Sequence, residues 1–289
     1  MKQNKHIQKL IRVALKEDIG SGDVTTRILI KRNRYTEGYI VAREKGILCG
    51  VDIVKTVFKL IDRTVKVKIL KCDGATVTNG DSIIRLRGSS YSILKGERVA
   101  LNFISRLSGI STATHAFVKK VRGTKAHIYD TRKTTPGYRI LEKYAVRTGG
   151  GCNHRMGLYD QVLIKDNHFK ILDKKTIGNF HALIAHMRKK IPRGMKIEIE
   201  ADNLTLLKKI VPAHPDVILL DNMNKEKLKK ALTMIQNENK KAKVKIVSEG
   251  SGRITLANVL TIAKMGVDRI SIGTITHSAT SLDFSLELV

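Results

Sequence analysis

The second half of the chain alternates between short apolar runs and helical segments, and this alternation is the strongest constraint on the fold. From about residue 125 onward the apolar runs read AHIYD, DQVLIKD, MKIEIEAD, DVILLDN, KVKIVSEGSG and VDRISIGT. Segments with helical spacing of apolar residues separate them, such as NFHALIAHMRKKI and NKEKLKKALTMIQ. Strands that alternate with helices form right-handed βαβ units. The sequence therefore predicts a parallel sheet, either open or closed into a barrel.

The first half has a different pattern, in which short segments alternate apolar and polar residues. Examples are EGYIVAREKGILCG, TVKVKILKCDGATV and DSIIRLRGSS, with Gly, Asn and Asp at the turns. Period-two alternation of this kind indicates half-buried strands. Residues 1–20 have the spacing of an amphipathic helix, and a helix from about residue 93 to 108 leads into the second half. We expect an α+β domain with a small, mostly antiparallel sheet.

The formal net charge of +28 over 289 residues is the most unusual bulk property. Such a charge is typical of proteins that bind nucleic acid or an anionic membrane surface. The alternative is a lysine-rich composition spread over solvated faces, as in NKEKLKKAL and ENKKAKVK. We favour the alternative, because the lysines are dispersed, the usual nucleic-acid modules are absent, and aromatic residues make up only 4% of the chain. We expect no nucleic-acid partner.

Cysteine usage and hydropathy bear on the cellular setting. Cys49, Cys72 and Cys152 are odd in number and show no CxxC spacing, so neither a disulfide framework nor a zinc site is expected. No stretch approaches ~20 consecutive apolar residues, and the basic N-terminus lacks the uninterrupted apolar core of a signal peptide. We expect a cytoplasmic protein without a membrane partner.

The predicted strands of the second half end in charged residues or in glycine turns. The residues at these ends are Asp130, Lys165, Glu200, Asp221, Glu249 with Ser251, and Gly273. In a parallel barrel the carboxyl ends of the strands converge on one mouth, where ligands bind. One polar strand end means little, because every strand must end somewhere. A succession that mixes acids, cations and glycine turns favours a binding site.

Two of these strand ends carry turns that suit a phosphate. EGSGRIT offers the Ser251 hydroxyl, the backbone amide of Gly252 and the start of a helix, and SIGTITHS offers a similar turn at Gly273. Either turn alone is read equally well as a tight connection. Together, at the last two strands of a barrel, they favour a phosphate monoester.

Glu200 and Asp221 end neighbouring predicted strands, where their carboxylates can face one another. One reading pairs them with the abundant local lysines. The other makes them hard oxygen ligands for Mg²⁺, directly or through water, or for the hydroxyls of a sugar. Beside phosphate loops we favour the second reading, with Mg²⁺ as the expected cofactor.

A dense group of cations lies between residues 129 and 169. Its members are Arg132, Lys133, His154, Arg155 and Lys165. Arginine grips carboxylate or phosphate with a planar fork, whereas lysine supplies a mobile point charge. The group therefore suits a small polyanion with both carboxylates and phosphates. We interpret His168 as an ordinary hydrogen-bonded histidine, and we do not favour a Cys152–His154 nucleophile, because nothing in the sequence orients such a pair.

Several segments together are characteristic of one enzyme family. They include EDIGSGDVTT, ALNFISRLSGIST, DTRKTTPGYRILEKYAVRTGGGCNHRMGLYD, IKDNH, IEIEADNL, VILLDNM, SEGSGRITLANV and GVDRISIGTITHS. From about residue 15 to its C-terminus the chain resembles the quinolinate phosphoribosyltransferases, the carboxylating nicotinate-nucleotide pyrophosphorylases. The resemblance implies condensation of quinolinate with phosphoribosyl pyrophosphate, release of CO₂ and pyrophosphate, and formation of nicotinate mononucleotide for de novo NAD biosynthesis.

The resemblance also implies roles for individual residues. The positions that match the dicarboxylate site are Arg132, His154, Arg155 and Lys165. The positions that match the phosphoribosyl pyrophosphate site and its Mg²⁺ are Lys133, Lys165, Glu200, Asp221, Ser251, Gly252 and Gly273. The catalytic roles fall to Lys133, Lys165, Glu200 and Asp221. Arg106 matches an arginine that reaches the neighbouring active site, which implies a homodimer and leaves hexamers open.

The fold that the resemblance implies is of the α/β class, with an N-terminal α+β sandwich domain followed by an incomplete parallel α/β barrel. We expect the sandwich to cover residues 1–108, joined by the C-terminal segment 277–289 as a closing strand. The barrel is expected to cover residues 109–276.

Arg253 departs from the family pattern, because relatives often carry a second glycine after Ser-Gly. The departure puts the geometry of the phosphate loop in question, although an arginine there favours an anion. Two alternatives to the family assignment are weaker. A related barrel such as those associated with molybdenum transport would lack the dicarboxylate cluster, and an inactive barrel would not combine strand-end acids, cations and glycine loops.

Overall fold

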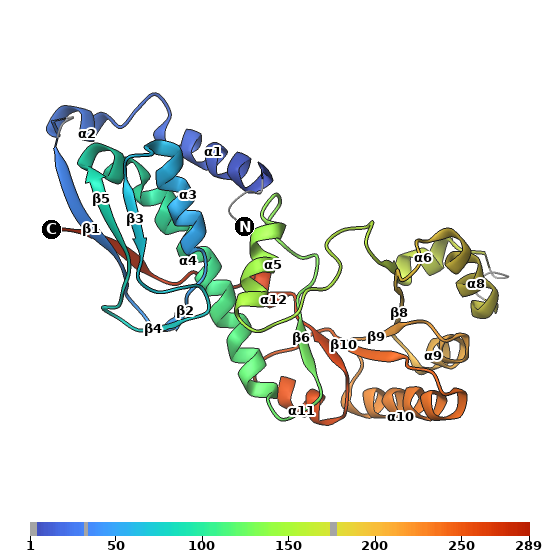
Figure 1. The fold of residues 1–289 in the computed structure, drawn as a ribbon. Coiled ribbons are helices and arrows are strands. Elements are labelled where there is room, and N and C mark those ends of the chain that lie inside the picture. Colours follow the sequence, from blue (N-terminus) through green and yellow to red (C-terminus); the bar gives the residue numbers. More distant parts are fainter. Residues whose placement is uncertain (1–4, 32–33, 174–177) are drawn as a thin grey trace. The chain divides into compact units, whose positions relative to one another are not determined.

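The computed structural model describes residues 5–31, 34–173 and 178–289, which divide between two compact units (Figure 1). The first unit comprises Met1–His115, Thr134–Gly150 and Thr274–Val289, and the second comprises Ala116–Lys133 and Gly151–Gly273. This division differs from the sequence-based boundaries mainly in residues 134–150, which pack with the first unit. Residues 1–4 of the predicted first helix lie outside the described residues.

The first unit contains a four-stranded sheet in the order β12-β1-β5-β3. Its strands are β1 (Tyr35–Ala42), β3 (Lys66–Ile69), β5 (Ser82–Ser89) and β12 (Phe284–Leu288). All three pairings in this sheet are antiparallel, which confirms the predicted α+β character. The C-terminal strand β12 pairs with β1 along the edge of the sheet. A separate two-stranded ladder joins β2 (Gly46–Ile47) to β4 (Thr76–Val77).

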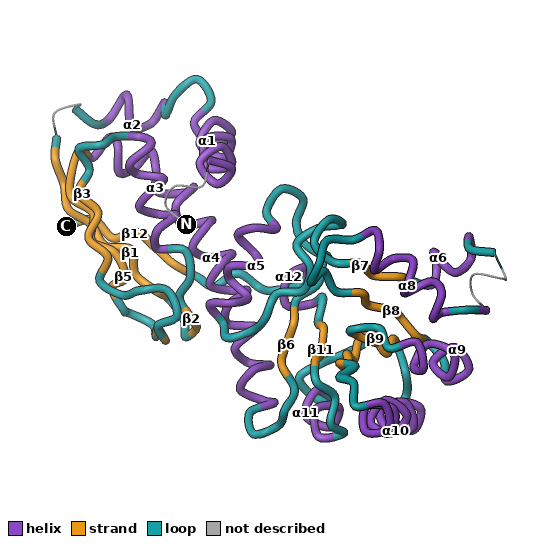
Figure 2. Tube along the Cα trace, turned by 45° about the vertical axis from the view of Figure 1, so that its right-hand side comes forward, coloured by secondary structure: helices purple, strands orange, loops and turns teal. Residues whose placement is uncertain are grey.

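Helices cover one face of this sheet. The helices of the first unit are α1 (Lys5–Ile19), α2 (Val24–Leu29), α3 (Val51–Ile61), α5 (Arg139–Thr148), α12 (Thr274–His277) and the larger part of α4 (Ser90–Val121). In both views α3 and α4 lie against the same side of the sheet (Figures 1 and 2). Helix α3, which the sequence analysis did not assign, buries Val54, Val57 and Phe58 at helical spacing. These side chains form part of an apolar core.

Helix α4 is longer than the predicted helix of residues 93–108. Its continuation is rich in Ser and Thr, which usually favour turns. Here the hydroxyls of Thr112 and Thr114 bond back to the carbonyls of Ser108 and Ile110, at 2.7 and 2.8 Å, so they are satisfied within the helix. Neither α4 nor any other helix in the described part of the chain is long and apolar enough to cross a membrane.

The second unit contains a six-stranded sheet in the order β6-β11-β10-β9-β8-β7, and every pairing in it is parallel. Its strands are β6 (His127–Tyr129), β7 (Val162–Ile164), β8 (Ile197–Ala201), β9 (Val217–Asp221), β10 (Val247–Ser251) and β11 (Arg269–Ser271). Each strand lies within one of the six predicted apolar runs. Within the described residues no pairing joins β6 to β7, so the predicted incomplete barrel is confirmed.

Helices connect these strands and lie on the outside of the curved sheet, as α9, α10 and α11 do in Figure 2. The helical elements are α6 (Asp166–Ile171), α8 (Phe180–Lys190), α9 (Leu204–Ile210), the 3₁₀ turn η1 (Val211–Ala213), α10 (Lys225–Ala242) and α11 (Val259–Lys264). The outer face of the sheet is apolar, with Ile197, Ile199 and Ile218 fully buried. The residues that alternate with them along each strand point to the inner face of the sheet.

Candidate active site

The inner face of the six-stranded sheet carries charged side chains. The parallel register places Glu200 opposite Leu219, Leu219 opposite Glu249, and Glu249 opposite Arg269. Glu198 precedes Glu200 by two residues on β8 and therefore points to the same side. Barrel interiors are usually filled with branched apolar residues. The charges on this face therefore mark a site.

Glu200 is the last residue but one of β8, and Asp221 ends the adjacent strand β9. Lys165 follows β7, and its Nζ lies 3.8 Å from Glu200 Oε2. Burial raises the pKa of Glu200; the Lys165 charge opposes the rise and the Asp221 charge adds to it. Glu200 and Asp221 together carry two negative charges, and the half-exposed Lys165 supplies only one positive charge to balance them.

The segment 151–161 runs between the two open edges of the sheet. Near its start Cys152 forms a parallel bridge with Tyr129 of β6, and its end leads directly into β7. The fully buried Asp130 holds the first residues of this segment in place. Its carboxylate accepts hydrogen bonds from Asn153 Nδ2 at 2.6 Å and from the His154 amide at 2.8 Å. The backbone of Cys152 adds two more bonds, because its amide donates to the Ile128 carbonyl at 2.7 Å and its carbonyl accepts from the Asp130 amide at 3.1 Å.

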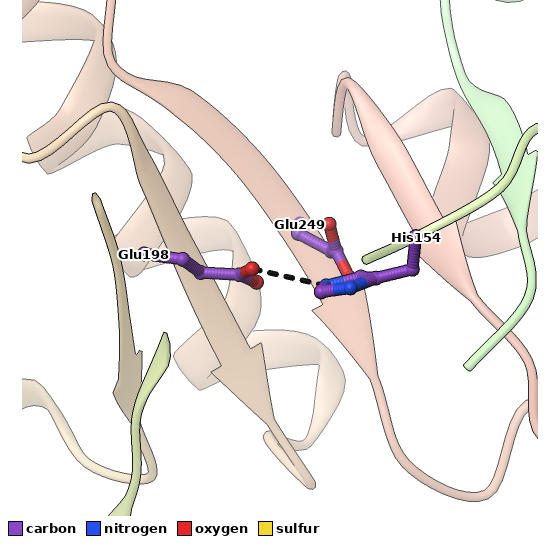
Figure 3. A group of neighbouring side chains, drawn as sticks. All are labelled: His154, Glu198 and Glu249. Carbon is purple, nitrogen blue, oxygen red and sulfur yellow. Dashed lines mark ion pairs between the residues drawn. The ribbon is translucent and has the colours of Figure 1, made fainter. Parts of the chain in front are cut away.

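Two buried acids, Glu198 and Glu249, approach the same end of the His154 ring, as Figure 3 shows. Its Nε2 is 2.9 Å from Glu198 Oε2 and 3.6 Å from Glu249 Oε1. Its Nδ1 accepts a hydrogen bond of 2.7 Å from the Arg155 amide. Burial, followed by the charge of Glu198, raises the pKa of Glu249 to about 7. Both ring nitrogens of His154 thus have partners within the unit, and its predicted contact with a dicarboxylate stays a prediction.

Arg155 is buried, and its Nη1 donates to the Gln161 carbonyl at 3.1 Å. Burial lowers the pKa of Arg155, and the charge of Arg132 lowers it further. Arg132 and the exposed Lys133 lie two and three residues after Asp130, just beyond the end of β6. The structure therefore brings two of the predicted guanidinium groups near enough for the charge of one to act on the other.

The turn after β10 is as tight as a phosphate loop requires. Gly252 has φ +94°, and a Cβ there would lie 2.2 Å from Asn222 Oδ1. The Asn222 amide also donates to the Ser251 carbonyl at 3.0 Å. Arg253 takes φ +50° and is exposed, so the turn forms without the second glycine. Gly273 follows β11, next to this turn in the sheet order.

Arg106 belongs to the first unit and is held by partners there. Its Nη2 lies 2.8 Å from Glu142 Oε1 and also bonds the Thr276 carbonyl, while Nη1 donates to the Ala279 carbonyl at 2.9 Å. Glu142 is fully buried. The predicted reach of Arg106 into a neighbouring site stays a prediction, and it would require these bonds to break.

His168 has the ordinary role that the sequence analysis preferred. Its Nδ1 accepts from the backbone amide of Lys165 at 2.9 Å, at the start of α6. This bond fixes the backbone at the point where Lys165 leaves β7. His168 therefore affects the site indirectly, by holding the backbone of Lys165 in place.

Sequence reasoning missed Glu198, Gln161 and Arg269 as parts of the site. Gln161 Nε2 donates to Glu198 Oε2 at 2.6 Å, and Arg269 Nη1 lies 3.8 Å from Glu249 Oε2. The Arg269 guanidinium also lies 4.8 Å from the centre of the Tyr129 ring. One signal was available: the alternation in IEIEA places two glutamates on one face of a strand.

Comparison with known proteins places these features in context. Two family models match the chain. The model of the quinolinate phosphoribosyl transferase N-terminal domain matches residues 23–108, and the model of the C-terminal domain matches residues 110–287. A protein of Mycobacterium leprae named carboxylating nicotinate-nucleotide pyrophosphorylase is 38% identical over 281 residues, which cover 96% of this chain and 95% of that protein. A Bacillus subtilis protein named as a probable enzyme of this kind is 39% identical over 98% of this chain and 93% of its own length.

Solved structures agree with this match. The crystal structure of NadC from Streptococcus pyogenes has a TM-score of 0.89 at 36% identity, covering 98% of this chain and 96% of that chain. The nicotinate-nucleotide pyrophosphorylase from Francisella tularensis has the same TM-score and identity, covering 99% of this chain and 97% of that chain. The similarity thus extends over both units.

Proposed function

Because the chain belongs to the quinolinate phosphoribosyltransferase family, we propose that its barrel mouth joins quinolinate to phosphoribosyl pyrophosphate. The enzyme is a phosphoribosyltransferase of NAD biosynthesis, of the kind named carboxylating nicotinate-nucleotide pyrophosphorylase. Its products are nicotinate mononucleotide, pyrophosphate and CO₂. The assignment of individual residues to these steps is our proposal.

The observation that carries the proposal is the pair Arg132 and Arg155. The pKa of Arg155 is lowered by burial and then by the Arg132 charge, while Glu198 and Asp160 offset part of this lowering, so the two cations repel one another. A planar dicarboxylate accepts hydrogen bonds from guanidinium groups in a bidentate manner. Binding quinolinate here replaces repulsion between cations with ion pairing, which gives the site its preference for a dianion.

We assign the 5′-phosphate of phosphoribosyl pyrophosphate to the turns at Ser251–Gly252 and at Gly273. A hydroxyl and backbone amides bind phosphate oxygens without a protonation change. Gly252 has no alternative at its position, because any side chain would collide with Asn222. Lys133, exposed beyond the end of β6, is assigned to the pyrophosphate.

Glu200 and Asp221 fit the family's magnesium ion. The two residues lie at the carboxyl ends of adjacent strands, within one residue of the end in each case, and the pKa of Glu200 is raised by burial and by the Asp221 charge. Mg²⁺ favours carboxylate oxygens and keeps several waters, so we propose that these acids hold it, in part through water. When bound, the ion neutralises charge that develops on the pyrophosphate leaving group.

The residues at the mouth complement the charge that the transfer creates. As the pyridine nitrogen attacks the ribose carbon and pyrophosphate leaves, positive charge builds on the ribose and negative charge on the leaving group. Glu200 and Asp221 stabilise the first and Lys133 and Lys165 the second. The bound pyridine nitrogen is then cationic, so the adjacent carbon retains the electron pair when CO₂ leaves. A proton replaces CO₂ at that carbon.

We also propose a cytoplasmic homodimer in which Arg106 serves the neighbouring subunit. The test mixes Arg106→Ala with Lys165→Ala, each inactive alone, under conditions that exchange subunits. If Arg106 acts across the dimer, the mixed dimers contain one complete site and regain activity. No recovery on mixing, from subunits shown to exchange, would assign Arg106 to the contacts with Glu142 inside its own subunit.

The first test of the function is a direct assay. Purified protein is mixed with Mg²⁺, phosphoribosyl pyrophosphate and either quinolinate or nicotinate, while CO₂ and nicotinate mononucleotide are followed together. We expect equal amounts of both products from quinolinate and no reaction of nicotinate. Absence of product from quinolinate, in a folded protein that binds phosphoribosyl pyrophosphate, would remove the dicarboxylate assignment.

A further inference from the structure

Two fully buried acids, Glu198 and Glu249, face His154 from β8 and β10, and neither has a role in the reaction assigned above. Their side chains point toward the imidazole ring from two different strands (Figure 3). Buried carboxylates are costly unless they are paired and hydrogen-bonded. A role in the site would explain why two such costly residues lie inside the barrel.

The hydrogen bonds define the state of the His154 ring. The Arg155 amide can only donate, and it lies 2.7 Å from Nδ1, so Nδ1 is the acceptor and carries no proton. The proton of the ring is then on Nε2, from which it is donated to Glu198 Oε2 at 2.9 Å. His154 is therefore held as a neutral ring with a fixed orientation.

The same bond argues against a metal ion in this cluster. Ligand atoms of His154, Glu198 and Glu249 lie within 4.8 Å of one another, which is compatible with a metal centre. A metal on Nε2 would require the proton on Nδ1, where it would be donated to a partner. The Arg155 amide occupies that position as a donor, so the ring cannot offer Nε2 to a metal without losing this bond.

Glu198 also fastens the far end of the segment 151–161. One oxygen, Oε2, accepts from His154 and, at 2.6 Å, from Gln161 Nε2. Arg155 lies between these two residues in the sequence, and its Nη1 donates to the Gln161 carbonyl. A single carboxylate oxygen thus fixes both sides of the loop that presents Arg155.

We infer that Glu198 and Glu249 are positioning residues, which hold the neutral His154 ring so that the segment 151–161 presents Arg155 to the dicarboxylate. Glu198 supplies the bonds, and Glu249 lies beside the same nitrogen, Nε2, at 3.6 Å. The link to catalysis rests on the proposed function, because it takes Arg155 as the dicarboxylate ligand. The state of the ring itself does not depend on that assignment.

The kinetic test uses Glu198→Gln, which keeps the shape but weakens the acceptor, and the exposed Glu226→Gln on α10 as the matched control. For Glu198→Gln we expect KM for quinolinate to rise by about a hundredfold, as for a misplaced binding group. KM for phosphoribosyl pyrophosphate should stay unchanged, because the Ser251 turn does not depend on this loop. An unchanged KM for quinolinate would overturn the inference.

Gln161→Leu serves as a second variant if Glu198→Gln does not fold. It removes one bond to Glu198 and leaves all charges in place, and the same selective rise in KM for quinolinate is expected. An equal rise for both substrates would indicate a general structural role and overturn the inference.

A spectroscopic test separates this inference from the proposed function. In protein labelled with ¹⁵N at histidine, and with His154 assigned by its absence in His154→Gln, we expect nitrogen shifts of the neutral ring protonated at Nε2. A ring protonated at Nδ1, a charged ring, or Zn²⁺ binding that Glu198→Gln abolishes would each overturn it. If the ring is as expected but quinolinate does not react, the proposed function fails and the positioning of the loop stands.

Discussion

The two units place opposite kinds of side chain on the inner faces of their sheets. In the first unit the sheet and its helices bury apolar residues, among them Phe58, Leu86 and Ile104. In the second unit the outer face of the sheet is equally apolar, but the inner face carries Glu198 and Glu249. Each buried apolar side chain stabilises the fold by about 1.5–3 kcal/mol, whereas a buried charge contributes little or costs free energy. The apolar interiors therefore account for the stability of the fold, whereas the charged inner face of the second sheet is available for chemistry.

The largest expected effect belongs to the apolar interior. Phe58→Ala is expected to lower the free energy of unfolding by about 3–5 kcal/mol, because it removes a fully buried ring and leaves a cavity. The protein that remains folded should keep its KM for quinolinate. Urea unfolding and steady-state kinetics measure the two quantities. A higher KM with unchanged stability would break the separation between the units.

The acids at the mouth should behave in the opposite way. Glu200→Ala and Asp221→Ala are expected to lower kcat about 10²–10³-fold, because they remove charge that stabilises the transition state. KM for quinolinate and the urea midpoint should change much less. Glu226→Ala, exposed on α10, is the control. Wild-type turnover in both variants would show that the assignment of these acids is wrong.

The buried acid pair gives a pH dependence of stability. The pKa of Glu249 is about 7 in the folded protein against 4.5 as its ordinary value, with a charge on His154 counted as lowering it. A neutral His154 ring removes that lowering, so the folded state binds more protons between these values in either case. Stability therefore falls as pH rises through this range, by on the order of 3 kcal/mol. Glu249→Gln should remove this part of the slope in urea unfolding at about pH 5 and about pH 8. An identical slope in the variant would contradict the shifted pKa.

The smallest effect is expected at Arg253. Its φ of +50° is unfavourable for an arginine, and Arg253→Gly relieves that strain but makes the unfolded chain more flexible. We expect a change in stability below about 1 kcal/mol. Loss of the guanidinium should raise KM for phosphoribosyl pyrophosphate, more at low than at high salt. The same KM at both ionic strengths would show that Arg253 does not act on the anion.

The prediction from sequence succeeded where a local pattern carries the information. The six strands of the second unit lie within the predicted apolar runs, because the apolar length and flanking turns of each strand are local properties. Helix α3 was missed although Val54, Val57 and Phe58 have helical spacing. The extension of α4 was also missed, because Ser and Thr usually favour turns, and composition does not show that hydroxyls such as that of Thr112 bond back to carbonyls of the same helix.

The candidate site was predictable only in part. Strand ends and glycine turns marked Glu200, Asp221 and Gly252, because the carboxyl ends of parallel strands meet at one edge. Glu198 has the same residue type as Glu200 and lies two positions earlier, yet it is fully buried. Its role depends on its contact with His154, which belongs to a loop more distant in the sequence.

The sequence by itself determined the strand and helix order, the family and the residues at the mouth, because these follow from local periodicity and from specific motifs. Only the tertiary structure decided that Glu198 and Glu249 meet at Nε2 of a neutral His154 ring, and that Arg106 is held by Glu142. These properties depend on burial and on donors and acceptors brought together from distant segments. A linear pattern does not contain them, because the protonation of a buried group is set by its neighbours in space.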